Sequence, residues 1–385
     1  MKILQVVSEL SPRMGGPAQA VLELSRVLAR EGQAVSIFAT DPDLKVFEQS
    51  HLRTKVTDVS IKLFKSIGWR HYYYSPSFKK ELKQRVRDFD IVHIHGIWTY
   101  PTLAASRICK EAGVPYVIRP CGMLDRYCFS HHQLRKKIYY ALAEQKNLTS
   151  AHAIHFTTEE ERHRSSMNGL ANQAVVIPLG LDLEPYLCLP PRGNFRKHYP
   201  HLEGKKIILF LGRINFKKGL DLLIDAFSAV LKETKEAHCI IAGPDDEGYG
   251  KRLKEWISEK GISEHVTVIG FVEGEAKLAL FRDSDIFCLP SHQENFGIAV
   301  VEAMAAGLPV VISDQVNLYR EIQSEQAGIV TGLNSSEIAS AFLRLLQDDH
   351  LRETMAMNSR AYVKRNYQWD KIVKDLMRLY EHIIS

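Results

Sequence analysis

The segment SHQENFGIAVVEAMAAGLPVV, residues 291–311, places Glu294 and Glu302 around an almost wholly apolar stretch. It follows IFCLP (286–290), a short apolar run that ends at proline and is typical of a buried strand. The apolar stretch itself predicts a helix, which ends at Gly307. Glu294 is therefore expected in the loop at the carboxyl end of the strand, and Glu302 in the second turn of the helix.

Strand-like apolar runs alternate with helix-like segments along most of the chain, first from ILQVV (3–7) and again from KIILFLG (206–212). Strands separated by helices form parallel sheets that are covered on both faces. Four prolines in residues 178–193 mark the connection between the two series. We therefore predict an α/β protein with two Rossmann-like, doubly wound domains that face each other across a cleft. Their predicted ranges are 1–184 and 185–366, followed by a helix in 367–385 that packs back on the first domain.

The composition is that of an ordinary globular protein, with 45% hydrophobic and 25% charged residues. Glu9 interrupts the opening apolar run, which favours a buried strand over a secretory signal. No run approaches the ~18 apolar residues of a membrane span, so we expect a cytoplasmic protein. Residues 1–186 carry 25 Lys and Arg against 18 Asp and Glu, and the remainder carries 25 against 27. The basic first half suits an anionic lipid surface or a phosphorylated substrate, or it serves solubility alone.

Six cysteines are scattered along the chain without the paired spacing of a zinc site. Several lie in apolar runs such as HCIIAG and DIFCLP, which predicts buried free thiols in a reducing compartment. We expect no metal site and no cofactor. The six are Cys109, Cys121, Cys128, Cys188, Cys239 and Cys288.

Ligands bind open parallel sheets at the carboxyl ends of the strands, so the loops that follow strands are the candidate sites. Gly15 and Gly16 follow the first strand and precede the first helix. Paired glycines let a backbone approach a ligand closely, and a helix N-terminus offers N–H groups to an anion. The dinucleotide fingerprint G-x-G-x-x-G is not found after the predicted strands, which argues against nicotinamide binding. The alternative for this glycine pair is a flexible loop.

The segment FLGRINFKKGLD (210–221) follows the first strand of the second domain. Arg213 and Lys218 lie on either side of a short turn, and Gly219 precedes the next helix. A guanidinium and an ammonium beside a helix N-terminus suit a diphosphate and could offset its charge without a metal. The alternative is a solvated basic turn, which is the interpretation that we give Lys217.

In IVHIHGIW (91–98), His93 and His95 share one face of a predicted strand, and His95 lies at its carboxyl end. Two histidines without further ligands are a weak metal signal, so a hydrogen-bonding role at the cleft is favoured over a metal role. Trp98 and Tyr100 follow and could stack on the ring of a ligand or pack as a lid. Arg119 ends the strand YVIRP and is also expected to face the cleft.

The whole pattern resembles the retaining nucleotide-sugar glycosyltransferases of glycosyltransferase family 4 (group 1), which have the two-domain GT-B fold. The resemblance spans nearly the whole chain. Its most specific part is E-x7-E, formed by Glu294 and Glu302, together with the Arg213–Lys218 turn. The other motifs that carry it are IIAGPDDEGYG (240–250), GFVEG (270–274), EAMAAGLPVV (302–311), GGPA (15–18) and HIHG (93–96).

The resemblance implies a role for each residue that matches a family motif. At the donor diphosphate it places Arg213, Lys218, Gly15, Gly16, Phe296 and Gly297. At the donor sugar it places Glu294, Asn295, Phe296 and His95. At the nucleoside it places Glu302, Phe271, Val272 and Gly243. It implies that the catalytic residues are Glu294, His95, Arg213 and Lys218. The acceptor-side residues that we expect are Trp98, Tyr100 and Arg119.

The resemblance also implies the reaction. We expect a metal-independent, retaining transfer of a hexose from a nucleoside-diphosphate sugar, with UDP as the expected nucleotide, to a saccharide or lipid-linked saccharide in polysaccharide or exopolysaccharide synthesis. The alternatives are a sugar-nucleotide epimerase of similar build, against which the E-x7-E pattern argues, and a non-catalytic protein that binds nucleotide sugars. No nucleic-acid partner is expected.

Basic residues in the first half raise the question of a membrane contact. Such clusters bind anionic lipid headgroups and would bring a lipid-linked acceptor within reach, at the inner face of the plasma membrane. The alternative is that they form solvated helix faces. The residues concerned are Lys79, Lys80, Lys83, Arg85, Arg87, Arg135, Lys136 and Lys137.

Overall fold

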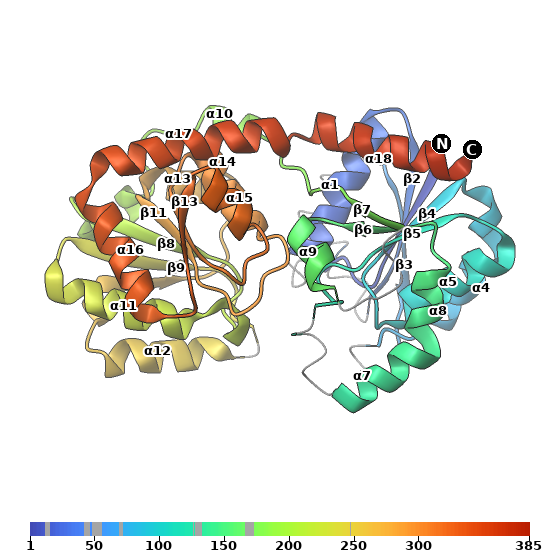
Figure 1. Ribbon diagram of the computed structural model, residues 1–385, viewed down its shortest axis with the longest axis horizontal. Coiled ribbons are helices and arrows are strands. Elements are labelled where there is room, and N and C mark those ends of the chain that lie inside the picture. Colours follow the sequence, from blue (N-terminus) through green and yellow to red (C-terminus); the bar gives the residue numbers. More distant parts are fainter. Residues whose placement is uncertain are drawn as a thin grey trace. The chain divides into compact units, whose positions relative to one another are not determined.

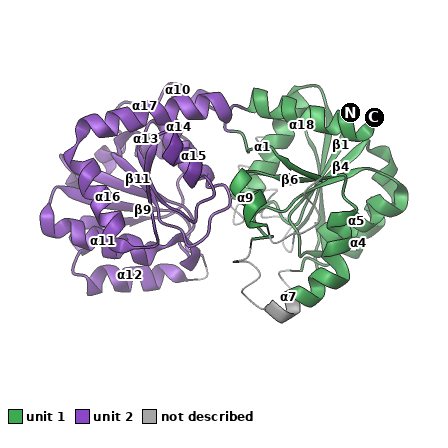
Figure 2. Cartoon of the chain, in the orientation of Figure 1, with its two compact units in different colours: residues 1–180, 369–385 green, residues 181–368 purple. Residues whose placement is uncertain are grey.

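The computed structural model of the chain divides into two compact units, residues 1–180 with 369–385, and residues 181–368 (Figure 2). Each unit is a parallel β-sheet flanked by helices (Figure 1), which confirms the predicted α/β class and the two doubly wound sheets. The residues that the structure describes are 1–11, 16–41, 47, 56–68, 72–125, 127, 133–165, 173–246 and 248–385.

The first unit has a seven-stranded sheet in which every pairing is parallel, in the order β3-β2-β1-β4-β5-β6-β7. The strands are β1 (Lys2–Val7), β2 (Ala34–Asp41), β3 (Ser60–Lys65), β4 (Ile91–His95), β5 (Tyr116–Arg119), β6 (Ala153–Phe156) and β7 (Ala174–Val176). Its helical segments are α1 (Gly16–Arg30), α4 (Pro76–Arg85), α5 (Tyr100–Ala112), α7 (Gln133–Tyr139), the π-helical turn η3 (Tyr140–Glu144), α8 (Gln145–Thr149), α9 (Glu159–Arg164) and α18 (Trp369–Ile384).

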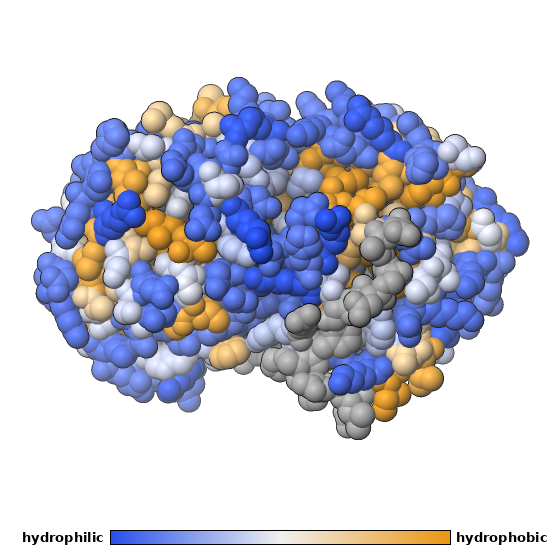
Figure 3. Space-filling view, viewed as in Figure 1, coloured by the Kyte–Doolittle hydropathy of each residue, from blue (hydrophilic) through white to orange (hydrophobic). Residues whose placement is uncertain are grey.

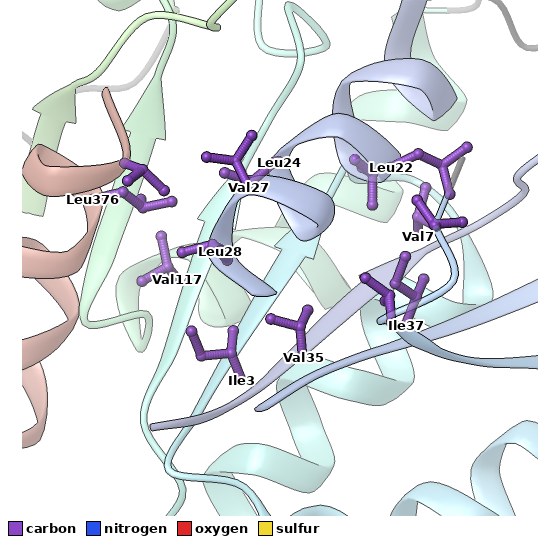
Figure 4. Close-up of a cluster of buried hydrophobic side chains, with 14 of the residues drawn as sticks. Ile3, Val7, Leu22, Leu24, Val27, Leu28, Val35, Ile37, Val117 and Leu376 are labelled. Carbon is purple, nitrogen blue, oxygen red and sulfur yellow. The ribbon is translucent and has the colours of Figure 1, made fainter. Parts of the chain in front are cut away.

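Alternation along the strands gives this sheet two apolar faces. Ile3 and Val7 pack with α1 and α18 in one core cluster, whereas Leu4 and Val6 pack with α4 and α5 in another. Figure 4 shows part of the first cluster. The C-terminal helix α18 joins this cluster because its buried residues recur at helical spacing. They are Trp369, Ile372, Val373, Leu376 and Tyr380.

The second unit has a six-stranded parallel sheet in the order β10-β9-β8-β11-β12-β13. The strands are β8 (Lys206–Leu211), β9 (Ala237–Ala242), β10 (Val266–Ile269), β11 (Ile286–Leu289), β12 (Val310–Ser313) and β13 (Gly328–Thr331). Its α-helices are α10 (Glu184–Leu187), α11 (Leu220–Glu233), α12 (Tyr249–Glu259), α13 (Gly274–Asp283), α14 (Ile298–Ala306), α15 (Tyr319–Ser324), α16 (Ser335–Gln347) and α17 (Asp349–Asn366).

In both sheets the strand order reverses beside the first strand of the unit. The reversal lies between β1 and β4 in the first unit and between β8 and β11 in the second. Connections leave such a point in opposite directions, and the crevice at the carboxyl ends of these strands is where open α/β sheets bind ligands. In the first unit, Gly16 comes after β1 and His95 is the last residue of β4. In the second unit, Arg213 comes after β8 and Glu294 comes after β11.

Several elements were not predicted, among them β3, β13, α16 and α17. The edge strand β3 is largely open to solvent and contains Lys62 and Lys65, so it lacks the continuous apolar run of a central strand. Strand β13 is only four residues long, which gives little sequence signal. Helices α16 and α17 lie in a region of the sequence where we did not recognise an apolar stripe. Within the described ranges, the helices are all too short or too polar to cross a membrane.

Candidate active site

The turn between β8 and α11 carries the two predicted cations. After β8 ends at Leu211, residues Phe216–Lys218 form a single 3₁₀ turn. Gly219 follows with φ of +65° and caps α11. This left-handed conformation is routine only for glycine, and it sets the direction in which the helix leaves the turn.

The loop after β9 holds the Arg213 side of this turn. The Arg213 guanidinium donates from Nη1 to Asp246 Oδ2 at 2.9 Å, and Asn215 Nδ2 donates to the same oxygen at 3.0 Å. The Ile214 N–H donates to the Pro244 carbonyl at 2.9 Å. Asp246 thus fixes Arg213 without burying it, because the arginine side chain stays 41% exposed.

The loop after β11 holds the Lys218 side of the turn. The His292 N–H donates to the Lys217 carbonyl at 2.7 Å, and the Phe216 and His292 rings stack with centroids 5.0 Å apart. Lys218 Nζ forms an ion pair with Glu294 Oε2, and both side chains are largely buried. The loops after the neighbouring strands β8 and β11 therefore bring together two residues that lie 76 positions apart.

Glu294 lies in a loop with a defined backbone. Its N–H donates to the Gln315 carbonyl at 3.1 Å, and its own carbonyl accepts from the Asn317 N–H at 3.1 Å. Gly297 then caps α14, which ends at Ala306 before the capping Gly307. As predicted, Glu294 precedes the helix and Glu302 lies in its second turn.

The N-terminus of α14 is suited to an anion. The helix has no acidic residue in its first turn and no side-chain cap at Gly297. Its first N–H groups and its dipole consequently present positive charge next to Lys218 and Glu294. Asn295 and Phe296 precede this end, with Phe296 buried against Tyr367 and Asn295 hydrogen-bonded to Asn317.

Glu302 is a buried carboxylate, not a surface acid of α14. Only 6% of the residue is exposed, and Oε1 accepts from Lys277 Nζ at 2.7 Å. Burial and the nearby Glu302 carboxylate both raise the pKa of Tyr186. Glu302 therefore has a cationic partner and a hydroxyl neighbour that keep its position fixed. Sequence reasoning missed Lys277, Tyr186 and Asp246, although Asp246 lies in a motif that carried the resemblance.

Three of the residues predicted at the nucleoside follow β9 and β10, which lie on the side of β8 opposite to β11. Gly243 follows β9 with φ of +145°, and a Cβ there would lie 1.9 Å from the Gly212 carbonyl oxygen. Phe271 is exposed and Val272 half-buried, just after β10. These residues and Glu302 all belong to the second unit, and their contacts with a nucleoside stay a prediction.

In the first unit, Gly16 is the first residue of α1, and Gly15 lies outside the described residues. His95 is buried at the carboxyl end of β4, and its Nε2 lies 2.5 Å from Gln5 Oε1. Burial lowers the pKa of His95 well below its usual range, and the Arg119 charge adds to this effect. His95 is therefore a neutral imidazole at neutral pH.

The residues predicted on the acceptor side differ in how far they are buried. Trp98 packs inside the unit, where its Nε1–H donates to the Met123 carbonyl at 3.2 Å. Tyr100 packs edge-on against Tyr74, which is exposed. Arg119 differs from the expectation of an open cleft residue, because it is only 1% exposed. It lies on the sheet face beside His95, where the register pairs the two residues.

Together the second unit presents two cations, each with a carboxylate partner, beside an uncapped helix N-terminus and a buried carboxylate. This arrangement can bind a diphosphate through charge and fix the hydroxyls of an attached sugar and nucleoside. Within the described part of the chain, His, Cys, Asp and Glu residues form no group of three that could hold a metal ion.

Comparison with known proteins identifies the class. Residues 191–362 match the family model of the glycosyl transferases group 1, and residues 15–180 match that of the glycosyl transferase 4-like domain. The chain superposes on the crystal structure of the Anabaena protein HepE, which was solved in complex with UDP and glucose, with a TM-score of 0.79 and 20% sequence identity. The match covers 99% of this chain and 100% of HepE, which confirms the GT-B fold.

Two relatives match over nearly their whole lengths. An uncharacterized glycosyltransferase of Methanocaldococcus jannaschii is 30% identical, covering 99% of this chain and 98% of the relative. The phosphatidyl-myo-inositol mannosyltransferase of Mycobacterium leprae is 29% identical, covering 96% and 94%. The chain belongs to the group 1 glycosyltransferases, which confirms the predicted family, and it is a glycosyltransferase.

Proposed function

We propose that this glycosyltransferase moves a hexose from a nucleoside-diphosphate sugar, with UDP as the nucleotide, to a saccharide or lipid-linked saccharide acceptor in polysaccharide synthesis, with retention of the anomeric configuration and without a metal. The observation that carries the proposal is the ion pair of Lys218 and Glu294 at the strand reversal between β8 and β11, just before α14, with Arg213 on the same turn as Lys218. The predicted nucleoside-site residues Gly243, Phe271 and Val272 follow neighbouring strands of the same sheet.

The proposed reaction uses these residues to stabilise a leaving group. The bond between the anomeric carbon and the diphosphate oxygen breaks, and the acceptor oxygen forms its bond on the same face of the sugar. The acceptor hydroxyl proton passes to the departing phosphate oxygen, so no side chain has to act as a nucleophile. Arg213, Lys218 and the N–H groups of α14 neutralise the charge that develops on the diphosphate. The two cations thus take the charge-neutralising role that a metal ion has in other transferases.

Glu294 has two consecutive roles in this proposal. Before donor binding it neutralises Lys218. When the diphosphate arrives, the ammonium turns to the phosphate, and the carboxylate becomes free to accept hydrogen bonds from sugar hydroxyls. In the proposal Glu302 accepts hydrogen bonds from the ribose hydroxyls of the nucleoside, and its ion pair with Lys277 supports this role by fixing the carboxylate.

A panel of nucleotide sugars tests the donor. We expect UDP and UDP-hexoses to raise the melting temperature by several degrees, because a ligand at a hundred times its Kd stabilises a protein by about 2.7 kcal/mol. GDP-mannose belongs in the panel because the Mycobacterium leprae relative is a mannosyltransferase. Thermal shift should be read together with chromatography of the incubated sugars.

The products separate the competing functions. Hydrolysis or transfer that releases UDP supports the transferase, whereas an inverted sugar carbon with the nucleotide still attached would indicate an epimerase. Stabilisation without turnover would indicate a protein that binds nucleotide sugars without catalysis, and neither effect with any donor would contradict the proposed donors. A rise in melting temperature with GDP-mannose alone would leave the proposed reaction standing but would replace UDP by GDP as the nucleotide.

We further propose a lipid-bound acceptor reached at an anionic membrane surface. The name of the Mycobacterium leprae relative specifies phosphatidyl-myo-inositol, a lipid. In this chain Ile138 in α7 and Leu142 in η3 are 51% and 76% exposed, and Lys137 and Lys146 on the same stretch are also exposed. Figure 3 shows hydrophobic residues beside hydrophilic ones at the lower right of the view, in the region where Figure 1 labels α7. Exposed apolar side chains flanked by lysines suit the interface of an anionic bilayer.

Leu142→Ser should weaken binding to vesicles that contain anionic lipid by roughly tenfold or more, because burying a leucine contributes about 1.5–3 kcal/mol. Co-sedimentation at rising salt measures the effect. Leu187→Ser is the matched control, since Leu187 is 77% exposed in the second unit and is not part of this surface. The proposed surface would be contradicted if wild type and Leu142→Ser bound the vesicles equally, or if binding did not weaken as the salt concentration rises.

A further inference from the structure

The loops that follow β8 and β9 are joined by their main chains. The Ile214 N–H donates to the Pro244 carbonyl at 2.9 Å, and the Asp246 N–H donates to the Ile214 carbonyl at 3.2 Å. Ile214 and Asp245 also form an isolated parallel bridge. These contacts are made by backbone atoms, so the two loops keep their places whatever side chain stands at position 246.

The Asp246 side chain therefore has a task other than joining the loops. Its Oδ2 accepts from Arg213 Nη1 at 2.9 Å and from Asn215 Nδ2 at 3.0 Å. A carboxylate has no proton to give, so the Asn215 amide must turn its nitrogen and not its oxygen toward Asp246. Asn215 thus fixes the carboxylate, and the carboxylate fixes Arg213.

Arg213 is held at one of its nitrogen atoms. Within the described part of the chain, Asp246 is the one hydrogen-bond or ion-pair partner of its guanidinium, through Nη1. Further N–H donors remain for a ligand, and the side chain is 41% exposed. A guanidinium can bind a phosphate through two parallel N–H···O bonds, a geometry that depends on how its plane is turned. An arginine that is already held loses less rotamer entropy when it binds.

We propose that Asp246 and Asn215 are positioning residues, which hold the Arg213 guanidinium by Nη1 so that its remaining N–H groups bind one phosphate of the donor as a fork. The presence of that phosphate rests on the proposed function. Arg213 then differs from Lys218 in how it binds. The Lys218 ammonium has to turn from Glu294 to the phosphate, whereas Arg213 binds while it is still paired with Asp246.

The order of the Arg213 side chain is the first test, and it needs no nucleotide. A guanidinium that is held gives separate Nη1 and Nη2 signals in NMR spectra of protein with ¹⁵N-labelled arginine, whereas rotation averages them. Arg213 is assigned from an Arg213→Lys variant. We expect separate signals in the wild type and averaged signals in Asp246→Ala.

Nucleotide affinity is the second test, measured by calorimetry with UDP and with GDP. Asp246→Ala should raise the Kd about tenfold, because the freed guanidinium loses the orientation given by a charged hydrogen-bond partner. Asp246→Asn keeps an oxygen that accepts from Nη1, so it should stay within about threefold of the wild type. In an Arg213→Ala background, Asp246→Ala should cause no further loss, since it acts only through Arg213.

Asp245→Ala is the matched control. The Asp245 carboxylate lies on the same loop, but it accepts from the Gly250 N–H in α12 at 2.9 Å. This variant should lower stability and leave the Arg213 signals and the Kd unchanged.

Three outcomes would overturn the proposal. They are averaged Arg213 signals in the wild type, an Asp246→Ala protein that binds nucleotide as well as or better than the wild type, and an equal loss from Asp246→Ala with and without Arg213. The last would show a merely structural role. A wild type with separate Arg213 signals that binds neither nucleotide would count against the proposed function alone, because the positioning of Arg213 would stand.

Discussion

Lys218→Ala is expected to lower turnover about 100-fold or more, the loss typical when one group that stabilises developing charge is removed. The structure gives a second reason for a large effect. Lys218 neutralises Glu294, so the alanine variant leaves a largely buried carboxylate without its partner, close to where the diphosphate would bind. The negative charges of the Glu294 carboxylate and the diphosphate would repel each other. Affinity for the donor should therefore fall together with kcat.

Lys217 supplies the matched control. It is the preceding residue of the same 3₁₀ turn, its side chain is exposed, and its backbone carbonyl, which the substitution keeps, accepts from His292. Lys217→Ala should therefore retain nearly full activity. Steady-state kinetics with the donor found in the panel and calorimetry with the free nucleotide measure both variants.

A double variant separates the two causes of the loss at Lys218. Lys218→Ala with Glu294→Gln removes the repulsion and should recover part of the nucleotide affinity without recovering turnover. Equal turnover of the Lys217 and Lys218 variants would defeat the assignment of the diphosphate to this turn.

The central sheets could be predicted because their strands are continuous apolar runs. Residues 207–211 and 286–289 are buried on both faces, and such segments differ plainly from the helices between them. The edge strand β3 could not be predicted in the same way, since three of its six residues are exposed and its apolar run is broken by lysines. Helix α17 is rich in charged residues and has only five buried positions in 18, so its helical period is weak in the sequence.

The sequence singles out the residues of the candidate site, but it does not give their contacts. Arg213, Lys218 and Glu294 stand out because each follows an apolar strand, where side chains reach a ligand. Their partners depend on strand order, which the sequence does not state. The Arg213–Asp246 and Lys277–Glu302 pairs join residues 33 and 25 positions apart, and each forms only because the intervening chain returns to the same edge of the sheet.

Arg119 shows the opposite case. Its place at a strand end was predicted, yet the side chain lies on the face that other elements cover, beside three neutral histidines. A strand end predicts nearness to the ligand edge, whereas exposure depends on which helices cover that face of the sheet. Here α1 and α18 belong to that cover, and α18 comes from the far end of the chain.

The second large effect is expected at Gly219. Gly219→Ala should reduce the free energy of unfolding by about 2–5 kcal/mol, from two sources. A side chain at φ of +65° costs roughly 1–2 kcal/mol, and the added Cβ would lie 2.0 Å from the Pro290 carbonyl oxygen, so one backbone segment must move at a further cost of about 1–3 kcal/mol. Gly248→Ala is the control, because Gly248 has φ of +77° and no atom within 4 Å of the added Cβ. Gly248→Ala should lose only the conformational cost of about 1–2 kcal/mol.

The displacement at Gly219 should also reach the site. Gly219 and Pro290 lie where the loops after β8 and β11 touch, and the same two loops carry Lys218 and Glu294. Forcing them apart separates the ammonium from the carboxylate, so the folded Gly219→Ala protein should bind nucleotide at least tenfold more weakly, a change of about 1.4 kcal/mol. Urea unfolding measures the first effect and calorimetry the second. If the two alanine variants lost equal stability and bound nucleotide equally, the close contact between the loops would have no part in shaping the donor site.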